Sequence, residues 1–586
     1  MVLRPLLALL SLAVLALPPP AHAVSPPPVE GKQGMVVSDQ ALASAAGAEI
    51  LRKGGNAVDA AVAVGYAQAV VNPCCGNLGG GGFMLIRLAD GRAVFIDFRE
   101  KAPAAATTDM YLDAKGAIVE GASLNGWKAV GVPGTVMGLD QALTKYGTLS
   151  RAEVMAPAIR LAREGFVVGP GDSAILAAGS KAFAKLPELA AVFLKGGAVL
   201  PPGERLVQAD LAATLEAIAK DGAPAFYSGD VAHKIAEASK AGGGLISEAD
   251  LAAYTAPERE PVRCSYRGYD ILSAPPPSSG GTIVCEILNI LEAWPLGYLG
   301  FNSADSVHLM TEAMRHAFVD RNSALGDPDF VKNPVEKLTS KAYATTIRAV
   351  IERDRAGVSK DIAPGVAPHE GTETTHYSVV DAKGNAVAVT YSLNAYFGAK
   401  VMAPGTGFFM NDTMDDFTIK PGAANMFGLV QGMANAIAPG KRPLSSMSPT
   451  IVSRGGKPFL VLGSPGGSRI ITAVVETIIN VVDHGMSLQE AVDAPRIHHQ
   501  WQPDVIYAEP FALSADTARA LAAMGHKIVV QKAWGAVEAI MAAGARPSGE
   551  ALPSFGDDSV RNWQPAPGSL YGANDDRRPA GAAAAQ

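Results

Sequence analysis

The sequence has 586 residues, of which 48% are hydrophobic and 18% charged, and its formal net charge is −7. This composition is typical of a folded protein with a large buried core and excludes a chain that is disordered throughout. No run of lysine and arginine stands out, so we expect no nucleic-acid partner. The length predicts two subdomains or one large two-layer domain.

The first residues have the pattern of a secretory signal peptide. Arg4 supplies a positive start, Leu6 to Leu17 is a short apolar run, and Ala21-His22-Ala23 is a small-residue cleavage site. The apolar run has about a dozen residues, fewer than the roughly 20 that span a bilayer. We therefore expect removal of residues 1–23, a periplasmic or secreted protein, and no membrane span.

The pattern of apolar residues and turns predicts the elements of the first hundred residues. They are a strand at 34–38, helices at 41–53 and 57–71, and paired strands at 83–87 and 93–98. Both helices are apolar on almost every face, and we expect other elements to cover them on more than one side. The glycine run from Gly79 to Gly82 lies between a helix and a strand, which indicates close packing.

Residues 136–350 are mostly helical by pattern, and the character of the chain changes at Thr374. The elements expected after that point are a hairpin at 375–380 and 386–393, strands at 450–453 and 459–462, and a helix ending at His484. Ser487 and Glu490 form a capping box for the next helix. The stretch 421–442 is rich in Gly, Asn and Pro, which suits a long functional loop. The Ala/Gly tail from Pro579 is predicted to be disordered.

The chain has four cysteines, at positions 74, 75, 264 and 285. Their spacing matches no zinc motif. A bridge between the neighbours Cys74 and Cys75 would be strained, so Cys264–Cys285 is the easier disulfide if the exported protein is oxidised. We expect all four to be small buried residues without bridges.

Thr374 is a candidate nucleophile. A cut before it would place a new α-amine, with a pKa of about 7.7–8.0, on the residue that carries the hydroxyl, so one residue would supply both nucleophile and base. Taken alone, Thr374 and Thr375 are better explained as ordinary residues at the start of a strand.

The segment Gly463 to Ser468 lies between a predicted strand and a predicted helix. Amide groups of glycines at a helix N-terminus favour developing negative charge, which suits an oxyanion hole. A phosphate-binding loop is an alternative, but the segment lacks the Lys-Ser/Thr ending and the G-x-G-x-x-G spacing of such loops.

Several polar residues have the chemistry needed to hold an amino acid. Arg99 suits a carboxylate, as do the hydroxyls of Ser445 and Ser446, while Asn394 and the Asp415-Asp416 pair suit an ammonium group. Taken one by one, such residues are more often solvated or in salt bridges.

Taken together, these motifs resemble the bacterial γ-glutamyltransferase (glutathione hydrolase) family from about Gly34 to Arg577. The matching segments are 54–60 (GGNAVDA), 76–84 (GNLGGGGFM), 97–100 (DFRE), 275–281 (PPPSSGG), 374–381 (TTHYSVVD), 414–417 (MDDF), 442–450 (RPLSSMSPT) and 463–470 (GSPGGSRI). Their shared order along the chain makes chance similarity implausible.

The resemblance implies an α+β fold, the αββα sandwich of N-terminal-nucleophile hydrolases. It also implies a precursor that cuts itself into a large subunit, 24–373, and a small subunit, 374–586, which stay together as a heterodimer. Thr374 is similar to the family's nucleophile and Thr375 to a second threonine that hydrogen-bonds it. Gly466 and Gly467 are similar to the oxyanion hole.

The resemblance also assigns the substrate-binding residues. Arg99, Ser445 and Ser446 correspond to the α-carboxylate site, Asn394 and Asp416 to the α-ammonium site, and Ser392 to a hydroxyl that positions the nucleophile. The loop 421–442 corresponds to the lid, and Arg577 to an arginine that pairs back to the core. The expected substrates are glutathione or other γ-glutamyl compounds, with water, amino acids or dipeptides as acceptors.

Three positions depart from the family pattern. Thr413 stands where relatives often have Gln or Glu, Phe427 where the lid often has Tyr, and residues 544–569 resemble an insertion. Acyl transfer should survive these changes, whereas they leave open the acceptor preference and the balance of hydrolysis against transpeptidation.

Two other functions fit the same sequence. Glutaryl-cephalosporin acylases resemble this family, but a glutaryl group has no α-ammonium and would not need Asn394 and Asp416. A non-catalytic exported binding scaffold would not need the nucleophile and the glycine pair. No cofactor motif or metal constellation is visible, and we expect His498 and His499 to be structural.

Overall fold

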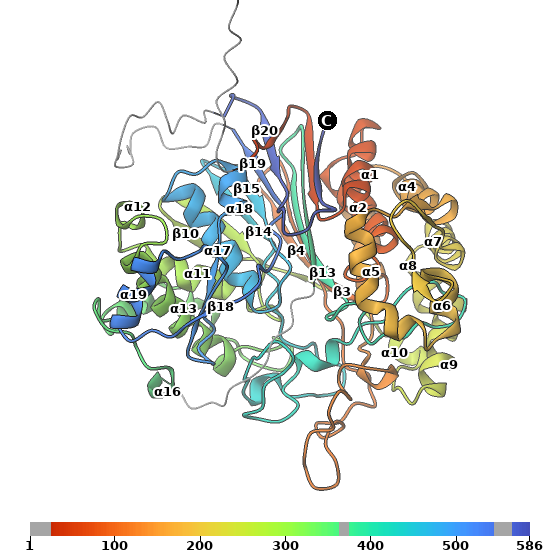
Figure 1. Cartoon of the computed structure of the whole chain (residues 1–586). Helices are drawn as coiled ribbons and strands as arrows, with labels where there is room; N and C mark the ends of the chain where they lie inside the picture. The colour runs from red at the N-terminus through yellow and green to blue at the C-terminus, as the bar shows by residue number, and fades with distance from the viewer. Residues whose placement is uncertain (1–24, 363–373, 544–564) are drawn as a thin grey trace, which may run out of the picture.

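Two face-to-face sheets form the centre of the molecule. The structure is a computed structural model that describes residues 25–362, 374–543 and 565–586. Two seven-stranded sheets pack against each other, and helices cover the outer face of each (Figure 1). The expected αββα sandwich is therefore confirmed. The predicted signal segment 1–23 and most of the predicted insertion lie outside the described residues.

The first sheet is antiparallel throughout, and the candidate nucleophile Thr374 directly precedes one of its inner strands. Its order is β21 (Ala582–Ala585), β2 (Gly34–Ser38), β12 (Thr375–Asp381), β13 (Ala386–Ser392), β3 (Gly81–Arg87), β4 (Ala93–Phe98) and β9 (Glu258–Arg259). β12 and β13 form the predicted hairpin, in which Thr375 pairs with Tyr391. The Asp381 carboxylate accepts the backbone N–H groups of Lys383 and Asn385, which fixes the turn between the strands.

The second sheet is also antiparallel. Its order is β1 (Val29–Gly31), β20 (Leu570–Ala573), β19 (Ala539–Ala542), β15 (Lys457–Leu462), β14 (Thr450–Arg454), β11 (Tyr269–Ser273) and β10 (Val262–Tyr266). Buried side chains from both inner faces, among them Phe83, Leu85, Ile451 and Val461, meet between the sheets. This apolar layer fixes the spacing of the two sheets.

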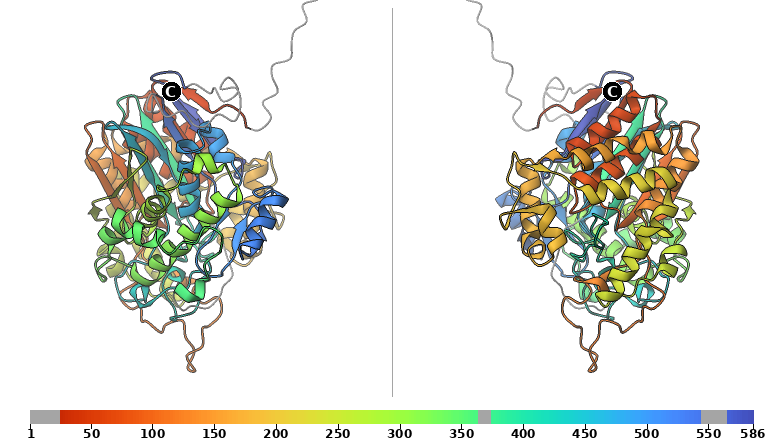
Figure 2. Two further views of the ribbon diagram at one scale, coloured as in Figure 1. Left: turned by 90° about the vertical axis from the view of Figure 1, so that its left-hand side faces the viewer. Right: turned by 90° about the vertical axis from the view of Figure 1, so that its right-hand side faces the viewer.

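One helical layer covers the first sheet (Figure 2). It contains α1 (Ala41–Arg52), α2 (Ala57–Val71), α3 (Thr135–Tyr146), α4 (Arg151–Glu164), α5 (Pro170–Phe183), α6 (Pro187–Phe193), α7 (Ala209–Asp221), α8 (Ala223–Tyr227), α9 (Asp230–Ala241) and α10 (Glu248–Ala252). Every residue of α2 is buried, as its all-round apolar sequence predicts, and Asn56 and Asp59 close its capping box.

The other helical layer covers the second sheet. It contains α11 (Gly280–Leu291), α12 (Leu296–Leu299), α13 (Ala304–Ala324), α14 (Val335–Leu338), α15 (Lys341–Arg348), α16 (Ser359–Ile362), α17 (Arg469–Val482), α18 (Leu488–Asp493) and α19 (Ala515–Ala523). β16 (Ile497–His498), β17 (Ile506–Ala508) and β18 (Ile528–Val530) form a small sheet beside it. Two-stranded pairs join β5 (Phe166–Val167) to β8 (Arg205–Leu206) and β6 (Leu194–Lys195) to β7 (Ala198–Val199). Within the described ranges, no helix is both long and apolar enough to cross a membrane.

Both large sheets combine strands from before and after Thr374. The earlier part of the chain supplies β2, β3, β4 and β9 to the first sheet, and the later part inserts β12 and β13 between β2 and β3. The second sheet likewise joins β1, β10 and β11 to later strands. A cut before Thr374 would therefore leave two fragments that share their backbone hydrogen bonds.

Two predictions from the sequence are wrong. The tail predicted to be disordered forms β21, because the edge of β2 offers unpaired backbone groups that the last residues satisfy. Cys74, Cys75 and Cys285 are buried as expected and Cys264 is half-buried, but all four are bridged, Cys74 to Cys75 and Cys264 to Cys285. The fold brings β10 and α11 together, so that the Cα atoms of the second pair are 5.9 Å apart, within the range for a disulfide.

Candidate active site

One pocket gathers most of the predicted site residues. Its lining includes Arg99, Thr374, Ser392, Asn394, Asp416, Ser445, Ser446 and Gly467. Of the predicted residues, Thr375 and Gly466 do not line it, although each is the chain neighbour of one that does. Residues more than 300 positions apart in the sequence therefore meet around Thr374, as the ion pair of Arg99 and Asp416 illustrates with a separation of 317.

Strand alternation separates the two threonines. Tyr377 and Val379 of β12 pack in the helix-side core, so Thr375 faces the helices, while Thr374 faces the space between the sheets. The Thr375 hydroxyl donates its one proton to Asp39 Oδ1 at 2.7 Å, and toward Thr374 it can only accept. The carbonyl of Thr374 accepts a hydrogen bond of 3.1 Å from Arg578 Nη2.

The glycine pair lies just before α17, whose N-terminus adjoins the pocket. Gly466 and Gly467 have φ values of +131° and +56°, which L side chains rarely adopt. Within the part of the chain that the structure describes, neither amide N–H has a hydrogen-bond acceptor. Free amides at a helix N-terminus suit a developing oxyanion.

A charged cluster forms the end of the pocket that suits an amino acid. Arg99 forms an ion pair with Asp416 and contacts Glu100 Oε2 at 3.3 Å, and all three side chains are at least nine-tenths buried. Burial raises the pKa of Asp416 to about 6, against the lowering effect of Arg99. Burial also raises the pKa of Glu100. The cluster therefore offers both an acidic and a basic group to a zwitterion.

Hydroxyl and amide groups line the rest of this end. The Ser445 Oγ accepts the N–H of Met447 at 3.1 Å, and the Ser392 Oγ accepts the N–H of Asn394 at 2.8 Å. Asn394 has a φ of +82°, and its side chain donates to the carbonyl of Asp412 at 3.2 Å. These bonds hold each polar group at a fixed place in the pocket wall.

Two of the three departures from the family pattern, Thr413 and Phe427, fall at or beside the pocket. Thr413 is buried and donates to Glu100 Oε1 at 2.9 Å, so it acts on the pocket through Glu100. Phe427 and Leu429, from the predicted lid 421–442, line the pocket directly. The Phe427 ring would lie 2.4 Å from a Cβ added at Gly467, which places it against the glycine pair.

Sequence reasoning missed Arg321 of α13, which also lines the pocket. Its Nη2 donates to Ser446 Oγ at 2.8 Å and its Nε to Ser279 Oγ at 3.0 Å. A single arginine near the end of a helix gives no signal of its own in one sequence. Only the pairing of the 275–281 loop with the 442–450 loop, through Ser279 and Ser445, reveals its place.

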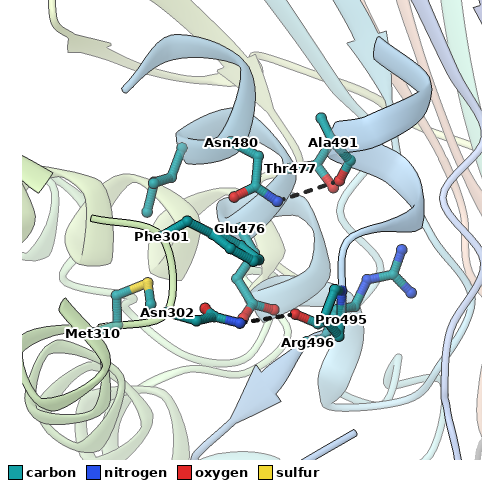
Figure 3. A pocket seen from close by; sticks show the side chains of 10 residues that line it. Phe301, Asn302, Met310, Glu476, Thr477, Asn480, Ala491, Pro495 and Arg496 are labelled. Atoms are coloured by element: carbon teal, nitrogen blue, oxygen red, sulfur yellow. Dashed lines mark hydrogen bonds between the residues drawn. The ribbon is translucent and has the colours of Figure 1, made fainter. Parts of the chain in front are cut away.

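A second pocket contains none of the predicted site residues. It lies between α13, α17 and α18, and Figure 3 shows Glu476, Asn302 and Asn480 on its wall. Burial raises the pKa of Glu476 to about 8, and its Oε2 has no partner in the described structure. The lining of this second pocket includes no nucleophile with a base and no anion-stabilising loop, so we place the candidate chemistry in the first pocket.

His308, Glu312 and His526 form a buried cluster of metal-ligand type, with ligand atoms within 4.8 Å of one another. The His308 Nδ1 and His526 Nε2 atoms are 2.8 Å apart, while the ring centroids are 5.1 Å apart. The rings therefore meet end to end, as in an N–H···N hydrogen bond, and their nitrogens do not converge on a third point as metal ligands do. The arrangement favours a structural role.

The remaining predicted polar residues are structural. Arg577 forms ion pairs with Glu509 and Asp575, which confirms that it pairs back to the core. His498 is buried between Thr472 and Gln500, within hydrogen-bond distance of both. His499 contacts Asp504 at 3.3 Å.

Comparison with solved structures identifies the class. A cephalosporin acylase from Bacillus halodurans aligns with a TM-score of 0.81 and 28% identity, over 98% of this chain and 99% of that one. The αββα sandwich, with a threonine at the start of a central strand inside the pocket, defines an N-terminal-nucleophile hydrolase.

Sequence comparison narrows the class to one family. The model of the gamma-glutamyltranspeptidase family matches residues 43–584. The glutathione hydrolase proenzyme of Pseudomonas sp. (strain A14) is 55% identical over 563 residues, which are 96% of each chain. The acylase ACY 1 proenzyme of Pseudomonas sp. (strain SE83) is 45% identical over 508 residues, 86% of this chain and 88% of the relative. The chain belongs to the gamma-glutamyltranspeptidase family.

Proposed function

We propose that this protein is an autoprocessing γ-glutamyltransferase and glutathione hydrolase. The observation that carries the proposal is the pocket, in which Thr374 lies with a buried Arg99–Asp416 pair. An arginine suits an α-carboxylate and an aspartate suits an α-ammonium, so the pair matches a free amino acid end. The sequence similarity to glutathione hydrolase proenzymes supports the same function.

In the proposed mechanism, the chain is cut before Thr374 and the new α-amine acts as the base. The hydroxyl oxygen bonds to the γ-amide carbon while its proton passes to the amine. The N–H groups of Gly466 and Gly467 hold the oxyanion that forms. The leaving amine takes the proton, and an ester remains on Thr374. Water or an acceptor amine then attacks the ester and restores the hydroxyl.

Thr374→Ala tests this assignment. We expect an uncut chain with no γ-glutamyl transfer, because both the nucleophile and the base that cleavage would expose are lost. Intact mass and N-terminal sequencing of the fragments measure the cut, and release of a γ-glutamyl anilide measures turnover. Thr374→Ser is the matched control and should still be cut and remain active. Normal cleavage or turnover in Thr374→Ala would remove Thr374 from its role.

A glutaryl amide acylase is the second candidate, since acylases are among the relatives. A glutaryl group has no α-ammonium, so it would leave the carboxylate of Asp416 without a ligand partner in the pocket. We therefore expect a higher kcat/KM for a γ-glutamyl anilide than for the glutaryl anilide. The reverse order would favour the acylase. Activity with neither donor, in fully cut protein, would favour a binding scaffold.

We further propose that the protein is exported and matures into fragments that begin at Val24 and Thr374. The signal pattern of residues 1–23 supports export, and so do the disulfides, which are typical of oxidising compartments. Fractionation of the producing cells, with sequencing of both fragment N-termini, tests this. A cytosolic protein that retains residues 1–23 would contradict it.

A further inference from the structure

Arg321 is a buried arginine on the wall of the catalytic pocket. It lies in the last turn of α13 with 1% of its surface exposed. Its hydrogen-bond partners are all neutral: Ser279 Oγ, Asn322 Oδ1 and Ser446 Oγ, at 2.8 to 3.0 Å. These bonds use three of the five guanidinium N–H groups.

No carboxylate among the described residues pairs with Arg321. The other fully buried arginines, Arg99, Arg315 and Arg442, each have a carboxylate oxygen within 3.5 Å. A buried charge without a partner is costly. Consistent with this, burial lowers the pKa of Arg321 to about 10, and only the charge of Asp416 opposes the shift. The pocket therefore contains a positive charge that, among the described residues, no carboxylate contacts directly.

The charge of Arg99, in contrast, is already balanced. It contacts Asp416 and Glu100, so the three side chains together are not positive when the acids are ionised. A carboxylate ligand would gain little net attraction from that cluster alone. Arg321 supplies the missing positive charge on the same pocket wall.

The hydroxyl groups beside Arg321 point to the same ligand chemistry. Ser446 Oγ accepts from Arg321, and Ser445 Oγ accepts from the N–H of Met447. Each hydroxyl still has its proton to donate, and neither donates to a described residue. Two hydroxyl donors and a cation on one wall suit an anion with several acceptor lone pairs.

We propose that Arg321 is the second cation of the α-carboxylate site, where it neutralises the carboxylate of the donor and directs the Ser446 hydroxyl toward it. The assignment rests on the proposed function, because it requires a donor with an α-carboxylate.

Three anilides separate the parts of the donor: γ-glutamyl, glutaryl, which lacks the amine, and 4-aminobutanoyl, which lacks the carboxylate. We expect Arg321→Gln to raise the KM of the first two about 10- to 100-fold, as for loss of a charged hydrogen bond. The KM of the 4-aminobutanoyl donor should change less than about twofold, because that donor makes no such bond. Arg321→Lys keeps the charge and should recover part of the loss.

Arg315→Gln is the matched control, since it removes a buried arginine of the same helix that pairs outside the pocket. It should not separate the three donors. An equal KM increase for all donors in Arg321→Gln, or an unchanged KM for the γ-glutamyl donor, would overturn the proposal.

Ligand binding tests Arg321 independently of turnover. Glutarate should raise the Tm of the wild-type protein more than 4-aminobutanamide, which has no carboxylate, does. Arg321→Gln, where it folds, should lose this difference, and Arg321→Lys should keep part of it. A difference in Arg321→Gln or Arg321→Lys as large as in the wild-type protein would overturn the assignment of Arg321. Wild-type protein that is cut and binds glutarate but turns over no γ-glutamyl donor would contradict the proposed function and leave the carboxylate site standing.

Discussion

Two glycine-rich segments of this chain need glycine for opposite reasons. A Cβ added at Gly79, Gly80 or Gly82 would lie 2.0 to 2.3 Å from a backbone carbonyl oxygen of a neighbouring segment. None of these three has a positive φ. Gly466 and Gly467 have positive φ values, and a Cβ on Gly466 would meet nothing nearer than 3.5 Å.

In the first segment, close contacts with neighbouring backbone require glycine. In the second segment, the positive φ values of Gly466 and Gly467 require it. Around Gly79 to Gly82, backbones approach so closely that no side chain fits. At Gly466 space remains, and at Gly467 only the Phe427 side chain would meet a Cβ. The unusual backbone leaves amide groups open beside a pocket. A substitution in the first segment should therefore affect folding, and one in the second should affect turnover.

Gly80→Ala should have the largest effect. Its Cβ would lie 2.0 Å from the carbonyl oxygen of Ser392, so the backbone itself must move. We expect a loss of at least about 3 kcal/mol in the free energy of unfolding, measured by urea denaturation, with little soluble processed protein. Gly91→Ala is the control, with a φ of +92° and no atom within 4 Å. Gly91→Ala should lose only about 1–2 kcal/mol of the free energy of unfolding. Equal losses in the two variants would contradict the contrast between close contacts and positive φ.

Gly467→Ala should fold, be cut and lose turnover. The new Cβ meets the Phe427 ring, a side chain that can move, so the ring is displaced into the pocket. We expect kcat/KM for a γ-glutamyl anilide to fall about 100-fold, as for an ångström-scale misplacement. Adding Phe427→Ala should restore most of it. A failure to restore activity would mean that the loss comes from the backbone of Gly467.

The response to pH should also come from the pocket. Burial raises the pKa of Asp416 to about 6, so the carboxyl is increasingly protonated below that pH. Protonation removes the negative charge that faces an α-ammonium, and KM for a γ-glutamyl donor should rise about tenfold per unit as pH falls below about 6. Glu476→Gln, in the second pocket, should leave this KM profile unchanged. A flat profile down to pH 5 would remove Asp416 from ammonium binding.

Phe427→Tyr should have the smallest effect. The ring lies against Gly467 on the wall that Asn394 shares, and a hydroxyl there adds a hydrogen-bonding group to the pocket. One hydrogen bond predicts a KM for the donor about 2- to 10-fold lower, with unchanged stability. Steady-state kinetics with and without a dipeptide acceptor measure this. A higher KM would indicate that the lid prefers an apolar ring.

Much of the local structure follows from the sequence. The helix 57–71 begins directly after its cap, Asn56, as predicted, and the strand predicted at 375–380 forms as β12 of the hairpin. The different roles of the two glycine segments could also be predicted, because one lies between a helix and a strand and the other between a strand and a helix. The cap and the strand depend on contacts within a few residues along the chain, whereas the carbonyl oxygens that require glycine at Gly79, Gly80 and Gly82 belong to the distant residues Thr390, Ser392 and Phe409.

Contacts between residues far apart in the sequence could not be predicted in this way. Thr375 donates a hydrogen bond to Asp39, which is 336 residues away in the sequence, and Arg578 donates one to Thr374, which is 204 residues away. The gathering of Arg99, Asp416 and Ser445 in one pocket followed only from resemblance to a family. Residue chemistry left salt bridges as an alternative, and Arg99 does pair with Asp416. Arg321 had neither a local signal nor a motif.

The last strand of the chain has a consequence for handling the protein. β21 contributes four short alanine residues as the outer strand beside β2. Without it, the longer β2 would expose a row of unpaired amides and carbonyls that can recruit another chain and seed aggregation. A purification tag fused after Gln586, or a trimmed C-terminus, would disturb this cover, so an internal surface loop is the safer place for a tag.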